Sequence, residues 1–162
     1  MKELLIQKLQ QYIIANNPDL LVELQGERKV TSYLQSKVAG INETLEQLLK
    51  NKTPEYIIEE VCMEELTEDL RPSRYNYLKQ ILEEEFKQQY EQFRDVGILT
   101  TEIVNLIQVC KPVFEDLNFS EENEDNQFTR YVIIGSISGY LESNSEKEKV
   151  SNGLQQSTET ER

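Results

Sequence analysis

One segment of the chain is dense in glutamate, and its spacing predicts a surface for a basic partner. The expected helix over residues 54–69 carries only acidic side chains on its polar face and no base. Carboxylates crowded in this way attract cations and repel phosphates. The candidate partner-binding residues are Glu55, Glu59, Glu60, Glu64, Glu65 and Glu68.

Two other interpretations of this acidic helix stay open. The first is a solvated face that only keeps the protein soluble. The second is a DNA mimic, in which the carboxylates take the place of phosphates and occupy a DNA-binding protein. That second interpretation requires carboxylates spaced like phosphates along an elongated face.

Two arginines follow the acidic helix and form the second candidate site. Arg71 and Arg74 flank the expected start of a helix, where free backbone N–H groups favour an anion. The alternative is local pairing with Glu68, Asp69 and neighbouring acids, which the excess of acids favours.

The residue types present argue against most catalytic chemistry. The chain has no histidine and only two cysteines, so histidine-based acid–base catalysis and closed zinc sites are excluded. It has no glycine-rich phosphate loop, and residues 120–126 lack the glycine and closing glutamate of a calcium loop. We therefore expect no catalytic residue, no cofactor and no metal. A small enzyme remains the least favoured hypothesis, and it would need a pocket with a perturbed carboxylate or Cys110.

Charge and cysteine usage bound the partners and the compartment. The formal net charge is −13, and residues 51–126 carry seven bases and nineteen acids. Direct nucleic-acid binding is therefore not expected. No secretory segment and no membrane-spanning run is visible, and Cys62 and Cys110 are isolated. These features predict reduced thiols in a cytoplasmic protein.

The chain is organised around residues 70–78. Pro72 stops the preceding helix, and Ser73 is placed to cap the next one. From there the apolar residues recur at three- and four-residue steps, which predicts one helix over residues 73–95, and Gly97 is its expected stop.

Similar periodicity predicts an all-α protein, an irregular bundle of six to seven helices. The other helices are expected at residues 2–15, 19–24, 27–50 and 54–69, then after Thr100, where Pro112 should kink or end the helix, and finally over 128–141. The apolar face of helix 27–50 is expected to consist of Val30, Leu34, Val38, Ile41, Leu45 and Leu48. The buried stripe of helix 54–69 is expected to consist of Ile57, Ile58, Val61, Cys62 and Leu66, and the face of the last helix of Phe128, Tyr131, Ile134, Ile137, Ser138 and Leu141. Gly40 either weakens its helix or permits a close helix crossing.

Residues 1–142 should form one domain, and residues 143–162 a disordered polar tail. An apolar patch near Tyr131 or Ile137 would indicate a symmetric homodimer.

Several strings resemble a family of small proteins from Bacteroides-type bacteria that is catalogued as a domain of unknown function. The resemblance implies an association with mobile conjugative elements and supplies no catalytic residue. It lies in LRPSRYNYL (70–78), LEEEF (82–86), GILTTEIVNLIQVCKPVFEDL (97–117), FSEENED (119–125) and RYVIIGSISGYL (130–141).

These observations favour a non-enzymatic cytoplasmic interaction module whose acidic surface, expected over residues 55–69 and 83–91, receives a basic protein partner. The alternatives are an acidic DNA mimic or regulator associated with mobile elements, and a small enzyme without a recognisable site.

Overall fold

The computed structural model describes residues 1–160, with side chains for residues 1–146, and it is entirely helical in that part of the chain. Its contacts divide the chain into two compact units, Met1–Tyr77 and Leu78–Arg162. The expectation of one domain over residues 1–142 stays a prediction. None of the described helices is long and apolar enough to cross a membrane.

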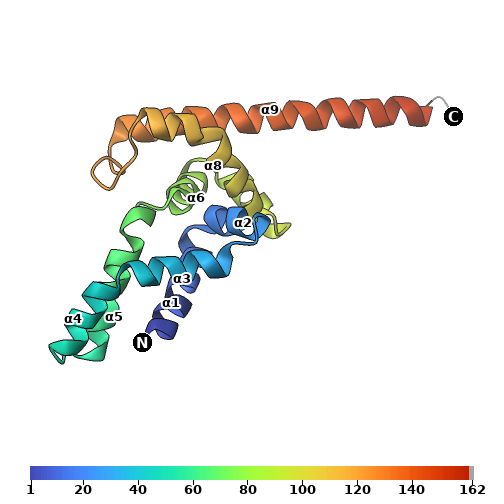
Figure 1. Cartoon of the computed structure of the whole chain (residues 1–162). Coiled ribbons are helices and arrows are strands. Elements are labelled where there is room, and N and C mark those ends of the chain that lie inside the picture. The colour runs from blue at the N-terminus through green and yellow to red at the C-terminus, as the bar shows by residue number, and fades with distance from the viewer. Residues whose placement is uncertain (161–162) are drawn as a thin grey trace. The chain divides into compact units, whose positions relative to one another are not determined.

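The first unit is built around α1 (Lys2–Asn16), which contacts α2 (Pro18–Gly26), α3 (Val30–Gly40) and α5 (Glu55–Thr67). α4 (Asn42–Lys50) lies beside α5 at one end of this unit, and the short 3-10 helix η1 (Glu68–Leu70) continues from α5 (Figure 1). Side chains at helical spacing from four of these helices form one core: Leu5, Leu9, Ile13, Leu34, Val38, Ile41, Leu45, Ile58, Cys62 and Leu66.

The second unit takes in most of α6 (Arg74–Glu85), then α7 (Lys87–Asp95), α8 (Leu99–Asp116) and α9 (Gln127–Thr160). α8 packs against both α7 and α9. Its buried side chains include Ile103, Leu106, Ile107, Cys110 and Phe114, and α9 contributes Ile133 and Ile137.

The expected count of six to seven helices is wrong, because two long periodic stretches are each broken by one residue. Residues 27–50 form α3 and α4, which meet at Ile41 (φ −103°, ψ 16°). The Ile41 N–H reaches the Val38 carbonyl at 3.3 Å, a step of three instead of four residues. Gly40 weakens the helix at this point, and a Cβ there would meet nothing within 4 Å, so no close helix crossing requires it.

The second break lies at Phe86 (φ −130°, ψ 48°), which separates α6 from α7 inside the expected helix 73–95. Three successive glutamates close α6, and their charges oppose the negative end of the helix dipole. Arg130 of α9 compensates two of them, with Nη2 at 2.8 Å from Glu84 Oε2 and 3.1 Å from Glu85 Oε1. A hydrogen bond from Gln80, followed by the contact with Arg130, lowers the pKa of the Glu84 carboxyl.

The predicted stop at Gly97 is confirmed. Gly97 has φ +79°, a conformation that glycine adopts without strain. The Ile98 N–H then reaches back to the Phe93 carbonyl at 2.9 Å, which satisfies one of the free carbonyls at the end of α7.

Pro112 lies inside α8 and does not end it. The ribbon of α8 changes direction along its length, as expected for a helix that contains proline (Figure 1). The buried face after residue 126 also differs from the expected one. Phe128 and Tyr131 are exposed, whereas Thr129, Ile133 and Ile137 are buried.

The predicted disordered tail, residues 143–162, falls mostly outside the residues whose side chains are described. The helical backbone of α9 continues through residues 143–160, so the helix extends beyond the expected boundary of the domain. Residues 161–162 of the predicted tail lie outside the described residues.

Candidate functional site

The acidic helix of the sequence analysis is α5, and its buried stripe decides which way the glutamates face. Ile58, Cys62 and Leu66 recur every four residues and are buried in the core of the first unit. The opposite side of α5 must therefore face solvent. Glu59 is half-buried, and the other five candidates are exposed: Glu55, Glu60, Glu64, Glu65 and Glu68.

Two of the six candidate glutamates are already matched by bases of the same unit. Glu59 forms an ion pair with Lys8 of α1, and Glu64 Oε1 lies 2.8 Å from Arg71 Nη2. The neighbouring Asp69 is matched as well, because its Oδ1 lies 2.7 Å from Lys37 Nζ of α3. Arg71 was a candidate from the sequence, but Lys8 and Lys37 were not, and no local signal could have found these two bases, since each pair joins residues of different helices.

Four glutamates remain without an ion pair among residues 1–146, namely Glu55, Glu60, Glu65 and Glu68. Two apolar side chains of α5 are exposed as well, and each has one of these carboxylates four residues later, Glu60 after Tyr56 and Glu65 after Val61. Tyr56 is 71 % exposed and Val61 is 39 % exposed. The expectation that Val61 belongs to the buried stripe is wrong, because the stripe runs through Ile58 and Cys62 and leaves Val61 on the solvent side. We call Tyr56, Val61 and these four glutamates the α5 acidic surface.

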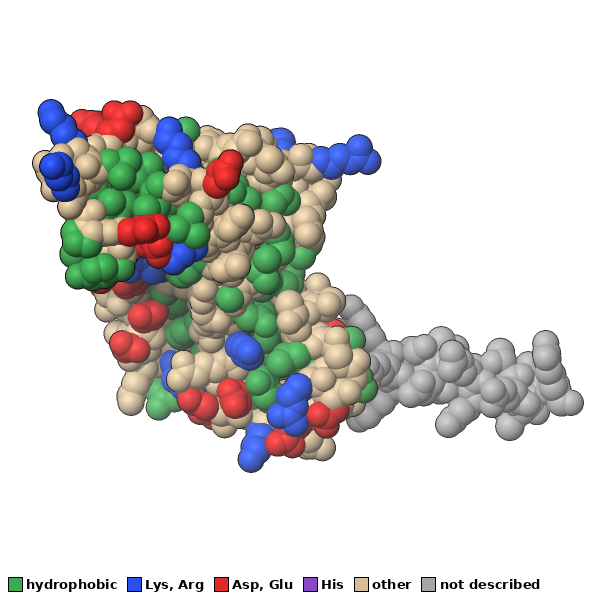
Figure 2. Space-filling view, turned by 90° about the horizontal axis from the view of Figure 1, so that it is seen from below, with side chains coloured by type: hydrophobic (Ala, Val, Ile, Leu, Met, Phe, Trp, Pro, Cys, Tyr) green, Lys and Arg blue, Asp and Glu red, His purple; other side chains and the backbone are tan. Residues whose placement is uncertain are grey.

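Charge alone would not single out this surface. On the face drawn in Figure 2, acidic and basic side chains are interspersed with hydrophobic ones. Where such exposed side chains pair with one another, the ion pair contributes little to stability or binding. The α5 acidic surface is distinguished by carboxylates that form no ion pair within the described part of the chain and that share their segment with exposed apolar side chains.

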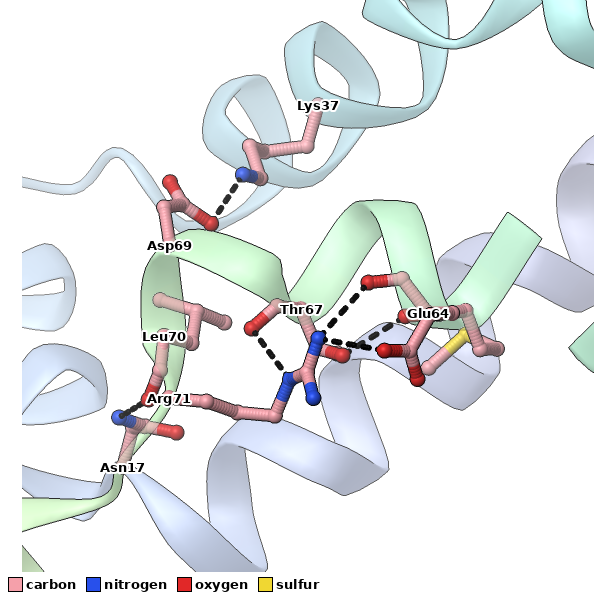
Figure 3. A network of polar contacts seen from close by, with 8 residues as sticks. Asn17, Lys37, Glu64, Thr67, Asp69, Leu70 and Arg71 are labelled. Atoms are coloured by element: carbon pink, nitrogen blue, oxygen red, sulfur yellow. Dashed lines mark hydrogen bonds and ion pairs between the residues drawn. The ribbon is translucent and has the colours of Figure 1, made fainter. Parts of the chain in front are cut away.

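Arg71, a candidate for anion binding, turns back along α5 instead (Figure 3). Its Nε donates to the Thr67 carbonyl at 3.3 Å, and its Nη2 donates to the Glu64 carbonyl at 3.4 Å and to the Glu64 carboxylate at 2.8 Å. It therefore satisfies carbonyls that the end of α5 leaves without helical partners. This geometry matches the local-pairing alternative, although the acid is Glu64 and not Glu68 or Asp69.

The predicted cap at Ser73 is confirmed, and it joins the start of α6 to the corner between α1 and α2. Ser73 Oγ accepts the Asn76 N–H at 3.0 Å and donates to the Asn16 carbonyl. Asn76 Nδ2 also donates to Asn16 Oδ1 at 2.8 Å, and Asn17 Nδ2 donates to the Leu70 carbonyl at 3.3 Å. These contacts hold the end of α5 in place, and with it the orientation of the α5 acidic surface.

Arg74, the other anion candidate, acts electrostatically on Asp19 in the first turn of α2. Burial raises the pKa of the Asp19 carboxyl, while hydrogen bonds from the backbone N–H groups of Asp19 and Leu20 and the charge of Arg74 oppose that rise. The sequence signal for Asp19 was only its place after a proline at a helix start. Anion binding at Arg71 and Arg74 stays a prediction.

Asp19 gives the fold a defined pH dependence. Because its pKa is raised in the folded protein, it contributes stability below its unfolded pKa of about 4, and this contribution is lost as the pH rises through the folded pKa. We expect Asp19→Asn to be more stable than the wild type near neutral pH, with the difference shrinking as the pH falls toward about 4. Urea unfolding of both proteins across that range measures the difference. A gap that widens on acidification would contradict the prediction.

The two cysteine thiols lie inside the fold. Both thiols are buried, and burial raises the pKa of Cys110 to about 11, so this side chain stays a protonated thiol at neutral pH. Burial, followed by the charge of Glu65, also raises the pKa of Cys62. No group of three or more cysteine, aspartate or glutamate residues among the described residues is arranged to hold a metal ion.

Comparison with known proteins identifies a family. A family model described as a domain of unknown function (DUF1896) matches residues 6–145. No curated protein and no solved structure matches the chain.

Proposed function

This chain belongs to the DUF1896 family of domains of unknown function, and we propose that it is a protein-interaction module whose α5 acidic surface binds a basic protein. The observation that carries the proposal is four exposed carboxylates that form no ion pair with residues 1–146, on the same segment as exposed Tyr56 and Val61. A partner with lysine or arginine around an apolar side chain would satisfy both kinds of group.

At such a surface, charge and apolar contact act on different steps of binding. The net charge of −13 steers a cationic partner toward the protein and raises its rate of encounter. Contact with Tyr56 and Val61 would then remove apolar atoms from water, which slows dissociation. Packing of α5 against α1 within the first unit keeps this surface formed before the partner arrives, so little ordering cost is added.

The association with mobile conjugative elements that the resemblance implies favours a nucleic-acid-binding protein as the basic partner. Proteins that handle nucleic acids carry basic faces, which suit a carboxylate-rich surface. We place the interaction in the cytoplasm, where two buried thiols such as Cys62 and Cys110 stay reduced.

The test is a charge-reversal variant with a matched control. Glu60→Lys/Glu65→Lys/Glu68→Lys changes only carboxylates that have no ion pair among the described residues, so the fold should be kept. We expect the partner captured by the wild type from lysate of the native host, once identified and purified, to bind this variant about tenfold or more weakly. Isothermal titration calorimetry measures the two affinities, and binding should weaken as salt is added.

The control variant reverses the same number of charges elsewhere. Glu83→Lys/Glu115→Lys/Asp116→Lys alters exposed residues at the ends of α6 and α8, where a cation is favoured by the helix dipole. It should bind the partner within about twofold of the wild type, apart from the loss of long-range attraction. Equal weakening in both triple variants would reject a localised α5 site. Displacement of the partner by duplex DNA would show that α5 occupies a DNA-binding face.

A further inference from the structure

A continuous line of exposed residues runs along α9 on the side opposite its buried face. Thr129, Ile133 and Ile137 point into the second unit and are buried. The exposed line recurs at steps of three and four residues, so its members lie one above another on the helix. In order, this α9 stripe consists of Phe128, Tyr131, Gly135, Gly139, Glu142 and Glu146, and all six are exposed.

The N-terminal end of the stripe presents two aromatic rings to solvent. Phe128 is 67 % exposed and Tyr131 is 66 % exposed, one turn apart on the same side of α9. Two neighbouring rings exposed to this extent form an apolar spot, and their faces attract cations. Neither ring is required by the core, because the buried face of α9 is complete without them.

The middle of the stripe has no side chains. A Cβ added at Gly135 or at Gly139 would meet nothing within 4 Å, so these glycines are not needed for packing inside the unit. Because these two glycines have no side chains, another chain can approach the helix backbone closely at this point. The whole stripe spans about 27 Å at the normal rise of an α-helix.

Both ends of the stripe are acidic. Glu142 and Glu146 close it at one end, and exposed Glu122 and Asp125 precede it in the turn before α9. Asn126 holds this turn against the helix, because its Oδ1 accepts the Phe128 N–H at 2.8 Å. The nearby base, Arg130, is engaged by Glu84 and Glu85 and does not neutralise these carboxylates.

We propose that the α9 stripe binds a cationic segment of another protein, a helix or extended peptide that carries arginine or lysine. Cations of that segment lie over the rings of Phe128 and Tyr131 and pair with the carboxylates at either end of the stripe. Its backbone passes close to α9 over Gly135 and Gly139. The stripe involves different residues from the α5 acidic surface, so the proposal does not rest on that surface.

Charge argues against a second copy of this chain as the occupant. In an antiparallel pair of α9 helices centred between the two glycines, Phe128 of one copy would face Glu146 of the other, with no cation to pair. A parallel pair would place glutamates against glutamates. Two chains of net charge −13 also repel one another before they meet.

The probe is a fluorescein-labelled peptide in which arginine alternates with alanine, long enough to span the stripe. Its binding to the full chain is followed by fluorescence anisotropy. We expect Phe128→Ala/Tyr131→Ala, which leaves every charge in place, to weaken binding about tenfold. Gly135→Leu should also weaken it by blocking backbone approach, although the open space at that position allows the fold to accept leucine. The peptide with citrulline in place of arginine should not bind.

Three results would overturn the proposal. The first is unchanged affinity in the double alanine variant while circular dichroism shows native helicity. The second is weaker binding of the peptide by the matched surface variant Tyr56→Ala together with unchanged binding by the double alanine variant. That result would place the peptide on α5. The third is a dimer detected by light scattering and abolished by Phe128→Ala/Tyr131→Ala, which would make a second copy the occupant.

Discussion

Replacing Phe114 with alanine should lower the free energy of unfolding by about 3–5 kcal/mol. Phe114 is fully buried in α8, and its ring centroid lies 4.8 Å from that of Phe119 at an interplanar angle of 56°. Truncation leaves a cavity and removes a tilted aromatic contact that contributes about 0.5–1.5 kcal/mol beyond area burial. Phe119 opens the segment that leads through the acidic turn to α9, so the loss reaches the turn that precedes the α9 stripe.

The matched control for this substitution is Phe128→Ala. The same atoms are removed, but Phe128 is 67 % exposed, so its stability should change by about 0.5 kcal/mol or less. Urea unfolding followed by circular dichroism compares the two variants. If the two units unfold in separate transitions, the loss should fall on the transition of the unit that contains Phe114. Equal losses in both variants would mean that the buried face of α9 is assigned wrongly.

Replacing Leu9 with alanine should lower the free energy of unfolding by about 2–5 kcal/mol. Leu9 is fully buried in α1, the helix that contacts α2, α3 and α5, so its side chain lies at the centre of the first unit. Because this core also holds Ile58 and Cys62, a cavity beside them should loosen the support of the α5 acidic surface.

The control here comes from the same helix. Ile14 of α1 is 51 % exposed, and Ile14→Ala should be nearly neutral. Thermal unfolding monitored at the helical signal distinguishes the two substitutions. A Leu9→Ala protein as stable as Ile14→Ala would contradict the packing of α1 against α3 and α5.

Periodicity predicted buried faces better than it predicted helix ends. Leu34, Val38, Ile41 and Leu45 were expected on one helical face, and all four are buried. The single-residue break at Ile41 is too short to rotate the second half of that face away from the core. A hydrophobic pattern at three- and four-residue steps therefore survives a break that it cannot reveal, which explains why the helix count was too low.

The α9 helix shows where periodicity fails. Two stripes with helical spacing coexist in its sequence, one through Phe128 and Tyr131 and one through Thr129, Ile133 and Ile137. The expected face of this helix combined Phe128 and Tyr131 with Ile137, and of these three only Ile137 is buried. Packing against α8 selected the second stripe, because the choice depends on the shape and position of the neighbouring helix.

Local chemistry determined the caps and stops of this protein. Pro72, Ser73 and Gly97 act through their own backbone and the next few residues, so their roles followed from the sequence alone. The all-helical class followed in the same way, from spacing that repeats within single segments. Which acidic side chains of α5 and η1 form ion pairs was determined largely by tertiary structure, because Lys8 and Lys37 reach Glu59 and Asp69 from other helices. Electrostatic pairing acts over a few ångströms of space, and separation along the chain does not predict that distance.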